Sequence, residues 1–245
     1  MKIIKEKSSY YLVTDTDKIK IEVEVVQKYR LYNNLNILDI NLIYQENQYY
    51  YYYKLAINRL AKMQSEAMLR NYLFEKDASN AIINQVIVTL KNHRYLDDYQ
   101  YAFNYTELKM HNWGPKKIQS QLIKNGVNQD IIDEVIARIN EREILVNLIS
   151  KEMTKIKSSI HDFKQKTIKK YFQKGFSLEI IKAVVEETLT DLDYDESKAI
   201  EKDYNKLLVR LNRKNLTPND MKFQIRNKLL QKGYRLDDIK KMEEQ

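Results

Sequence analysis

The fold is decided by the stretch WGPKKIQSQLIKNGVNQDIIDEVI, residues 113–136. Pro115 suits the first turn of a helix, where the N–H that proline lacks would have no partner. Gly126 suits the end of that helix, because glycine tolerates the left-handed conformation of many helix C-termini. Either Asn128 or Asp130 can cap the next helix. The stretch therefore predicts two short helices around a glycine turn, with apolar residues at helical spacing at Ile118, Leu122, Ile123, Ile131, Ile132, Val135, Ile136 and Ile139.

The same pattern recurs three more times along the chain. YFQKGFSLEIIKAVV surrounds Gly175, LLQKGYRLDDIKKM surrounds Gly233, and a weaker upstream copy has Asp77 where the glycine should be. The four centres are separated by 49, 49 and 58 residues, which predicts a tandem array of helical repeats. The apolar pattern of these copies includes the pairs Leu73–Phe74, Tyr171–Phe172 and Leu229–Leu230 in the first helix.

Composition limits the class of protein. Only four glycines and two prolines in 245 residues favour a mostly helical chain. The absence of cysteine excludes disulfides and thiolate chemistry. No apolar run is long enough to span a membrane and the N-terminus lacks a signal-peptide core, so we expect a cytoplasmic protein. The net charge of +8 favours an acidic partner such as nucleic acid, although such a charge also serves solubility alone.

Residues 1–25 depart from the helical pattern. Their apolar residues alternate with polar ones, which predicts a small antiparallel hairpin or three-stranded sheet. Residues 24–32 predict a short helix, Asn33–Asn34 a break, and residues 39–62 a long helix. Tyr49–Tyr53 in the long helix fit either core packing or stacking on nucleic-acid bases. Five consecutive residues cannot share one helix face, so packing is the favoured interpretation.

These patterns together predict a mainly α protein, with tandem three-helix repeats in an elongated, curved array and a small N-terminal antiparallel β element. The last repeat is expected to be truncated to two helices, as suits a terminal cap. The predicted division is residues 1–61 for the β element and one helix, 62–110, 111–159 and 160–215 for repeats one to three, and 216–245 for the truncated fourth repeat.

Catalytic and metal-binding patterns are weak throughout the sequence. Asp97 and Asp98 are adjacent on a predicted helix and diverge, so helix capping is a better interpretation than acid–base catalysis. The segment DLDYDE, residues 191–196, lacks the glycine and the terminal bidentate glutamate of a calcium loop and is interpreted as a helix start. The three histidines are not at ligand spacing. We therefore predict no enzyme activity, no cofactor and no metal site.

Basic residues recur on the predicted repeats. Lys166, Lys170 and Lys174 follow one another every four residues, and Lys124, Lys174 and Lys232 flank the glycines of repeats two to four. Equivalent positions of stacked repeats share one surface, which suits a phosphate backbone or an acidic groove in a protein filament. A solvated helix face is an equally strong alternative for lysines. The candidate partner- or DNA-binding residues are Lys116, Lys117, Lys124, Lys166, Lys169, Lys170, Lys174, Arg210, Arg213, Lys214, Lys222, Arg226, Lys228 and Lys232.

GPKKIQSQLIKNGV, preceded by YLDDYQYAFNY at residues 95–105, resembles the RecX family, regulatory proteins of the bacterial recombinase RecA. The resemblance extends from the N-terminal strands to the final LLQKGYRLDDI and is carried by periodic apolar positions more than by invariant polar residues. The chain departs from the family at Met68–Leu69, where a Glu-Leu pair is usual, and at Asp77, which replaces the glycine. Family roles of those positions are therefore not transferred. The fourth repeat resembles the longer branch of the family.

The resemblance implies a negative modulator of RecA that binds the RecA–DNA filament. Such a protein inhibits the ATPase, strand-exchange and coprotease activities of RecA in homologous recombination, DNA repair and the SOS response. The expected partners are the RecA filament and single- or double-stranded DNA, with DNA bound weakly and in a salt-sensitive manner. We expect a monomer that does not bind a membrane. The alternative is a stand-alone helical-repeat protein that binds DNA without sequence specificity, using the same basic residues without RecA.

Overall fold

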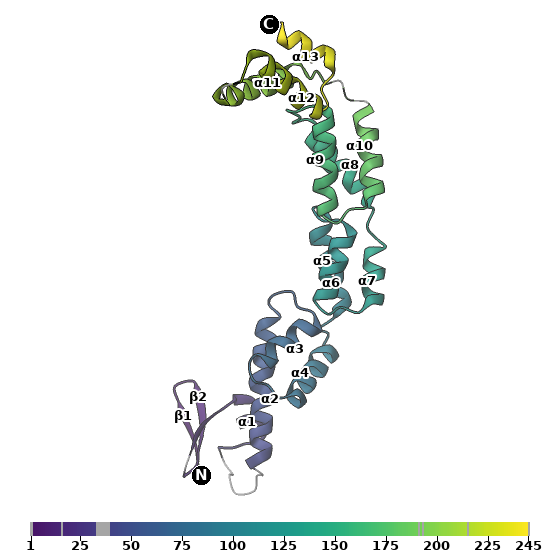
Figure 1. The fold of residues 1–245 in the computed structure, drawn as a ribbon. Helices are drawn as coiled ribbons and strands as arrows, with labels where there is room; N and C mark the ends of the chain where they lie inside the picture. The colour runs from purple at the N-terminus through teal and green to yellow at the C-terminus, as the bar shows by residue number, and fades with distance from the viewer. Residues whose placement is uncertain are drawn as a thin grey trace. The chain divides into compact units, whose positions relative to one another are not determined.

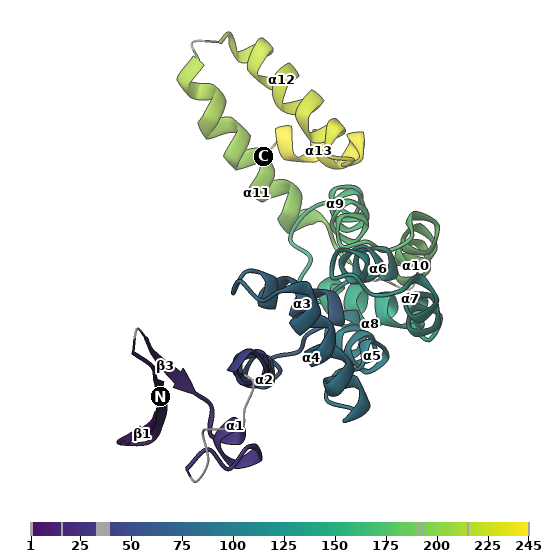
Figure 2. The same ribbon diagram turned by 90° about the horizontal axis from the view of Figure 1, so that it is seen from below.

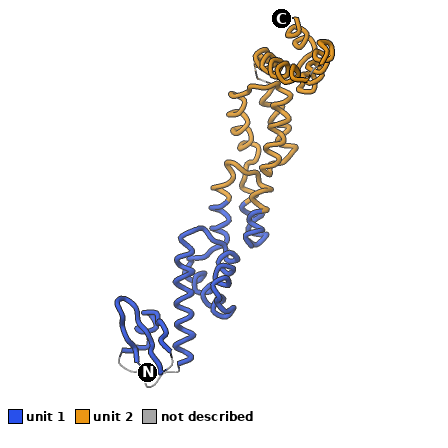
Figure 3. The backbone as a smooth tube through the Cα atoms, turned by 60° about the vertical axis from the view of Figure 1, so that its left-hand side comes forward, with its two compact units in different colours: residues 1–105, 121–135 blue, residues 106–120, 136–245 orange. Residues whose placement is uncertain are grey.

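The computed structural model describes residues 2–15, 17–32, 40–190, 192, 194–214 and 216–244 (Figure 1). These residues form two compact units, one of residues 1–105 with 121–135 and the other of residues 106–120 with 136–245 (Figure 3). The described part contains thirteen α-helices and a single small sheet of three strands. The prediction of a mainly α fold with a small N-terminal antiparallel β element is confirmed.

The sheet belongs to the first unit and has the order β1-β2-β3. Its strands are β1 (Lys2–Glu6), β2 (Ser9–Val13) and β3 (Lys18–Ile21), and both pairs are antiparallel. Leu12 and Ile21 bury one face against the two helices that follow, α1 (Val23–Lys28) and α2 (Ile40–Arg59). A three-stranded sheet of this size needs such a helical partner to bury its apolar face. The alternation of apolar and polar residues therefore predicted both the strands and their buried face.

The two predicted N-terminal helices are shorter than expected. The helix predicted over residues 24–32 is α1, which ends at Lys28, and the long helix predicted over residues 39–62 is α2. The predicted break at Asn33–Asn34 lies outside the described residues. Most of the tyrosine run packs as expected: Tyr49, Tyr52 and Tyr53 contact the core formed with the next two helices, Tyr50 contacts the core under the sheet, and Tyr51 is exposed.

The remaining helices follow the predicted repeat pattern. The helix predicted to begin at Pro115 does so, and Gly126, Gly175 and Gly233 each have a positive φ just after a helix. Asp77 also has a positive φ, of 64°. The helices are α3 (Glu66–Phe74), α4 (Asn80–Asn92), α5 (Asp98–Met110), α6 (Pro115–Lys124), α7 (Gln129–Ile136), α8 (Glu141–Met153), α9 (Ile160–Gln173), α10 (Leu178–Thr190), α11 (Ser197–Leu211), α12 (Pro218–Gln231) and α13 (Leu236–Glu243), and the short 3-10 helix η1 (Asn212–Lys214) follows α11.

Hydrophobic clusters group these helices in threes. One cluster joins α2 to α3 and α4 in the first unit. In the second unit, one cluster joins α8 to α9 and α10, and another joins α11 to α12 and α13 (Figure 2). Each cluster thus contains the two helices around a central turn and the helix that precedes them. The repeat boundaries predicted from the sequence place α8 and α11 at the end of the preceding repeat instead, because periodicity does not show which neighbour a helix packs against.

Joints between successive repeats are built on the turns. The first helix of one repeat begins against the turn of the next. The Ser65 hydroxyl donates a hydrogen bond to the Asn125 carbonyl, the Gly114 N–H donates to the Lys174 carbonyl, and the Ser159 hydroxyl donates to the Lys232 carbonyl. An added Cβ at Gly126, Gly175 or Gly233 would lie within 2.5 Å of a Cβ atom of that neighbouring helix. Glycine is therefore required at these turns by both its backbone conformation and the close approach.

The first copy of the turn shows why Asp77 is tolerated there. The Lys76 carbonyl, which is equivalent to the carbonyls at the other joints, accepts a hydrogen bond of 2.9 Å from the Tyr52 hydroxyl on α2. A long side chain thus makes the contact that the start of a helix makes elsewhere. Asp77 itself is exposed and aspartate is among the residues that adopt a positive φ most readily.

We expect Ser159→Ala to destabilise the second unit by about 2 kcal/mol, from about 1 for the helix cap and about 1 for the buried hydrogen bond. Ser159 is fully buried, caps α9 by accepting from the Asp162 N–H, and satisfies the Lys232 carbonyl. Urea unfolding followed by circular dichroism measures the loss. Ser79→Ala is the control, because Ser79 is exposed and caps only α4. Equal losses for the two variants would show that the joint adds nothing to the cap.

Candidate functional site

The fourteen predicted basic residues divide into two groups. Four form ion pairs with carboxylates: Lys166 with Asp162, Lys170 with Glu152, Arg226 with Glu243, and Lys232 with Asp203. The other ten form no ion pair of this kind within the described residues: Lys116, Lys117, Lys124, Lys169, Lys174, Arg210, Arg213, Lys214, Lys222 and Lys228. A carboxylate partner lowers the local positive potential, so the second group is better suited to attract phosphate.

The residue directly before the central residue of a turn is not a lysine in every copy. Where it is a lysine, its charge is not always unpaired. Lys76, Lys174 and Lys232 occupy this position in three copies, but Asn125 occupies it in the copy around Gly126, and Lys124 lies one residue earlier. Lys232 is also neutralised by Asp203, whose carboxylate lies 2.7 Å from the lysine nitrogen. Whether these lysines contact a partner stays a prediction.

The second unit brings three of the predicted lysines together at one joint. Backbone hydrogen bonds from Gly114 to Lys174, of 2.8 Å, and from Lys116 to Gly175, of 3.2 Å, hold the start of α6 against the end of α9. Lys117 and Lys170 both lie close enough to Lys174 to act on its charge. The joint therefore concentrates positive charge from two helices that are far apart in the sequence.

Two aromatic rings lie among these lysines. The nitrogens of Lys109 and Lys117 are 5.2 and 4.4 Å from the centre of the Trp113 ring. Those of Lys170 and Lys174 are each 5.4 Å from the centre of the Tyr171 ring. Cation–π contacts attract Lys117 and Lys174 to these rings without neutralising their charge. We call this set the aromatic–lysine cluster: Lys109, Trp113, Lys117, Lys170, Tyr171 and Lys174.

Electrostatics within the aromatic–lysine cluster favour an added anion. Burial, followed by repulsion from Lys170 and Lys117, lowers the pKa of Lys174, although Glu152 opposes the shift. Burial also raises the pKa of Tyr171, which keeps its proton and donates a hydrogen bond of 2.7 Å to Glu152. Glu152 is shared between Tyr171 and Lys170 and so compensates only part of the positive charge. An anion that approaches Lys117 and Lys174 would relieve their mutual repulsion.

Sequence reasoning missed two members of the aromatic–lysine cluster, Lys109 and Trp113. A signal was available, since Lys109, Trp113 and Lys117 follow one another every four residues across the start of α6. The break in the helix before Pro115 hid it, because helical spacing applies only within one helix. Three of the other predicted residues, Arg210, Arg213 and Lys214, lie at the exposed end of α11 and in η1, where positive charge complements the helix dipole.

The carboxylates that the sequence singles out have structural roles. Asp97 accepts hydrogen bonds from the N–H groups of Tyr99 and Gln100 and so caps α5, as predicted. Asp98 accepts a hydrogen bond of 2.7 Å from the Glu66 N–H at the start of α3. Burial raises the pKa of Asp98, and this backbone hydrogen bond opposes the shift. Both carboxylates are occupied in organising helix starts, and neither faces the other as an acid–base pair would.

The acidic segment before α11 has a similar role. Asp195 accepts a hydrogen bond from the Ser197 N–H, and Glu196 accepts one from the Ile160 N–H at the start of α9. Two residues of the predicted segment, Asp191 and Asp193, lie outside the described residues. Within the residues that the structure describes, no group of three or more His, Asp or Glu side chains could hold a metal ion.

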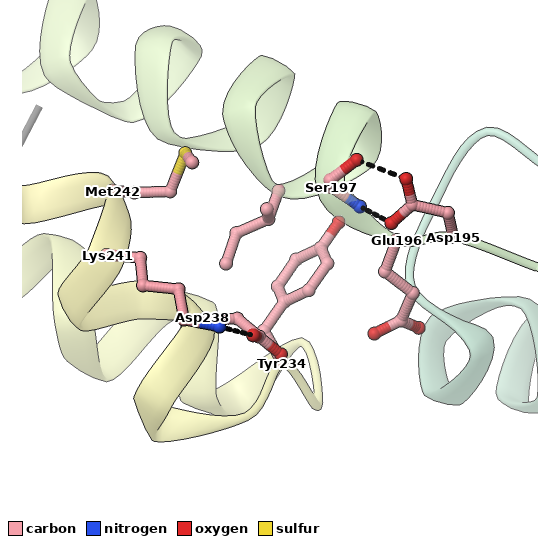
Figure 4. Close-up of a pocket in the computed structure, with 8 residues that line it drawn as sticks. Asp195, Glu196, Ser197, Tyr234, Asp238, Lys241 and Met242 are labelled. Atoms are coloured by element: carbon pink, nitrogen blue, oxygen red, sulfur yellow. Dashed lines mark hydrogen bonds and ion pairs between the residues drawn. The ribbon is translucent and has the colours of Figure 1, made fainter.

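A cavity of about 250 Å³ lies beside this segment, between the start of α11 and α13 (Figure 4). Its polar groups already have partners: Asp195 binds Ser197, Asp238 lies 3.5 Å from the Lys241 nitrogen, and the Tyr234 hydroxyl donates to Asp203. The cavity thus offers no unpaired nucleophile or base. Among the described helices, none combines the length and apolar character needed to cross a membrane.

Taken together, the fold and the surface define a class: a helical-repeat protein in which lysines gather around a half-buried tryptophan and a buried tyrosine at a joint between two repeats. Comparison with known proteins then gives the family. The chain is 30% identical over 247 residues to regulatory protein RecX of Listeria monocytogenes serovar 1/2a, which covers 96% of this chain and 91% of the relative. The chain belongs to the RecX family of regulatory proteins.

Other relatives agree with this assignment, and two solved structures share the fold. RecX proteins of Oceanobacillus iheyensis and Streptococcus agalactiae are 26% and 25% identical over 92% and 98% of this chain, and the matches cover 86% and 96% of those relatives. A crystal structure of a regulatory protein RecX matches 76% of this chain and all of its own, with a TM-score of 0.59 and 21% identity. RecX from Lactobacillus salivarius matches 58% of this chain and 97% of its own, with a TM-score of 0.52 and 23% identity. No family model matches the sequence.

Proposed function

We propose that this protein is a negative modulator of RecA that binds the RecA–DNA filament. By this proposal it inhibits the ATPase, strand-exchange and coprotease activities of RecA and so limits homologous recombination, DNA repair and the SOS response. The observation that carries the proposal is membership of a family of regulatory proteins over nearly the whole chain, at 30% identity. The protein catalyses no reaction and needs no cofactor in this role, and it acts as a cytoplasmic monomer.

The aromatic–lysine cluster supplies the contact with DNA in this proposal. Lys117 and Lys174 have no carboxylate partner within the described residues, and cation–π contacts position both of them. Neutralising phosphates with such lysines releases counterions, which makes binding favourable and salt-sensitive. A protein that binds one state of the filament more tightly than another shifts the population toward that state. Inhibition then requires only that the preferred state hydrolyses ATP slowly.

The test is the rate of DNA-dependent ATP hydrolysis by the RecA of the same organism, titrated with this protein at two salt concentrations. We expect the rate to fall when far fewer than one molecule is present per RecA, because one bound molecule affects many filament subunits. Higher salt should weaken the effect. An unchanged rate together with salt-sensitive binding to bare DNA would contradict the proposal. That result would favour the alternative, a stand-alone DNA-binding protein without sequence specificity.

A further inference from the structure

A large apolar side chain is exposed at the same position of every repeat. Phe74, Ile123, Phe172 and Leu230 each stand three residues before the central residue of a turn, and they are 67%, 52%, 54% and 42% exposed. The sequence pattern predicted them as part of the apolar stripe of the first helix, and in this respect the interpretation of the pattern was wrong. The buried residue is the one before each of them: Leu73, Leu122, Tyr171 and Leu229.

Helix geometry explains the difference. Successive residues are about 100° apart around an α-helix, so the residue after a fully buried one points away from the core. On α12 the exposed apolar surface extends further, because Phe223 is 64% exposed and lies seven residues before Leu230, on the same face. We call Phe74, Ile123, Phe172, Phe223 and Leu230 the apolar row.

The apolar row differs from ordinary exposed apolar residues because it recurs at the same position of each repeat. A single exposed apolar side chain needs no explanation in a folded protein. Here four repeats of differing sequence keep an exposed aromatic or branched aliphatic residue at one register, where a polar residue would be better solvated. The register is also occupied in the copy around Asp77, which has lost the glycine of the other copies. The exposed apolar group is therefore kept independently of the turn chemistry.

Few unpaired basic residues share the face of the apolar row, although Lys116 lies seven residues before Ile123 on α6 and is therefore on the same face. On α9, Phe172 is about 160° around the helix from both Lys170 and Lys174, which belong to the aromatic–lysine cluster. One turn before the apolar residue stand Asn71 on α3, Ser120 on α6 and Asn227 on α12, and only α9 has a lysine there. On α3 and α12 the nearest arginines, Arg70 and Arg226, are paired with Glu66 and Glu243.

We propose that the apolar row docks onto RecA subunits of the filament, while the aromatic–lysine cluster contacts the phosphates of the DNA. This inference rests on the proposed function. A phosphate backbone is recognised by cations without a carboxylate partner, and few of these lie beside the apolar row. The cores of protein interfaces, by contrast, are depleted in charge and rich in aromatic residues. The occupant is therefore a protein surface with apolar pockets.

A repeating partner fits the row better than a second copy of this chain. Phe74 lies on α3, Phe172 on α9 and Leu230 on α12, so each anchor belongs to a different hydrophobic cluster. A two-fold dimer needs one continuous, self-complementary patch of roughly 800 Å² on each partner. Separate anchors on α9 and α12, two successive repeats of the second unit, instead suit pockets that recur on successive identical subunits.

The experiment compares the full-length variant Phe172→Gln/Leu230→Gln with Leu108→Gln/Val209→Gln. Leu108 and Val209 lie in the same unit, are 61% and 59% exposed, and are outside the apolar row. Binding is measured to RecA filaments and to bare single-stranded DNA, with circular dichroism and sedimentation as checks of helicity and mass. We expect the row variant to lose about tenfold in filament affinity, the size of effect that buried anchors have. Its binding to bare DNA and its helicity should match those of the control variant.

Each other outcome overturns the inference. Equal filament affinity of the two variants would show that the row is merely solvated. A parallel loss of bare-DNA binding would assign the row to nucleobases. A wild-type dimer that dissociates in the row variant would assign the row to a second copy. If wild-type protein fails to bind filaments at all, the proposed function fails first, and this result is seen before any variant is made.

Discussion

Gly175→Ala is expected to destabilise the second unit by about 4 kcal/mol, from about 2 for the backbone conformation and about 2 for overpacking. Gly175 has a φ of +88°, which side chains other than glycine rarely adopt. An added Cβ would also lie 2.5 Å from the Lys117 Cβ and from the Lys117 backbone nitrogen. Backbone atoms cannot move aside as a flexible side chain does, so the joint must open. Denaturant unfolding followed by circular dichroism measures the change.

Asp77→Gly is the matched control for this variant. Asp77 has a φ of 64° at the equivalent position, and its exposed side chain is accommodated there. Glycine relieves the strain of the positive φ but raises the conformational entropy of the unfolded chain. These effects oppose each other, so we expect the free energy of unfolding to change by less than about 1 kcal/mol. Because the aromatic–lysine cluster spans the Gly175 joint, Gly175→Ala should also weaken DNA binding. Full stability of Gly175→Ala would mean that the joint is not as close as the structure shows.

Lys117→Gln/Lys174→Gln is expected to weaken binding to DNA roughly tenfold or more at low salt, and to reduce the slope of log affinity against log salt by about 2. Neither lysine has a carboxylate partner within the described residues, so removing them leaves no carboxylate unpaired. Helicity should be unchanged, since both side chains lie over the faces of aromatic rings rather than in a core. Binding titrations at several salt concentrations give both quantities.

Lys202→Gln/Lys206→Gln is the control for net charge. Both residues are exposed on α11 in the same unit and lie outside the predicted binding set. The two double variants remove the same charge from a chain of net charge +8. An equal loss of affinity in both would show that binding depends on overall charge and not on the aromatic–lysine cluster. Lys170 is left in place because its removal would leave Glu152 without its lysine partner.

Local structure could be predicted from the sequence to a large extent. The period of the glycine turns predicted the order of the helices, and Pro115 marked the start of α6 correctly. A capping role was predicted for one of Asp97 and Asp98, and Asp97 is the residue that caps α5. These features depend on residues within one or two helical turns of each other, so a single sequence contains nearly all the information needed.

The family could also be predicted from the sequence, because it is carried by the whole pattern of apolar positions. The binding residues could not be predicted as well. In the sequence, Lys170 and Lys232 cannot be distinguished from Lys117 and Lys174. Within the described residues, only Lys170 and Lys232 have carboxylate partners, and those partners lie on other helices. Ion pairing depends on which helices meet, which periodicity does not show.

The sequence by itself determined the helices, their turns and the repeat that relates them, since these follow from local spacing and backbone preference. Tertiary structure alone decided which helices share a core, where Trp113 meets the lysines, and which side of each apolar stripe stays outside. Phe172 shows the reason most simply, because it continues the stripe of Tyr171 in the sequence and yet is 54% exposed. An amphipathic stripe is wider than the surface that a neighbouring helix can cover, so contact with that neighbour decides which residues are buried.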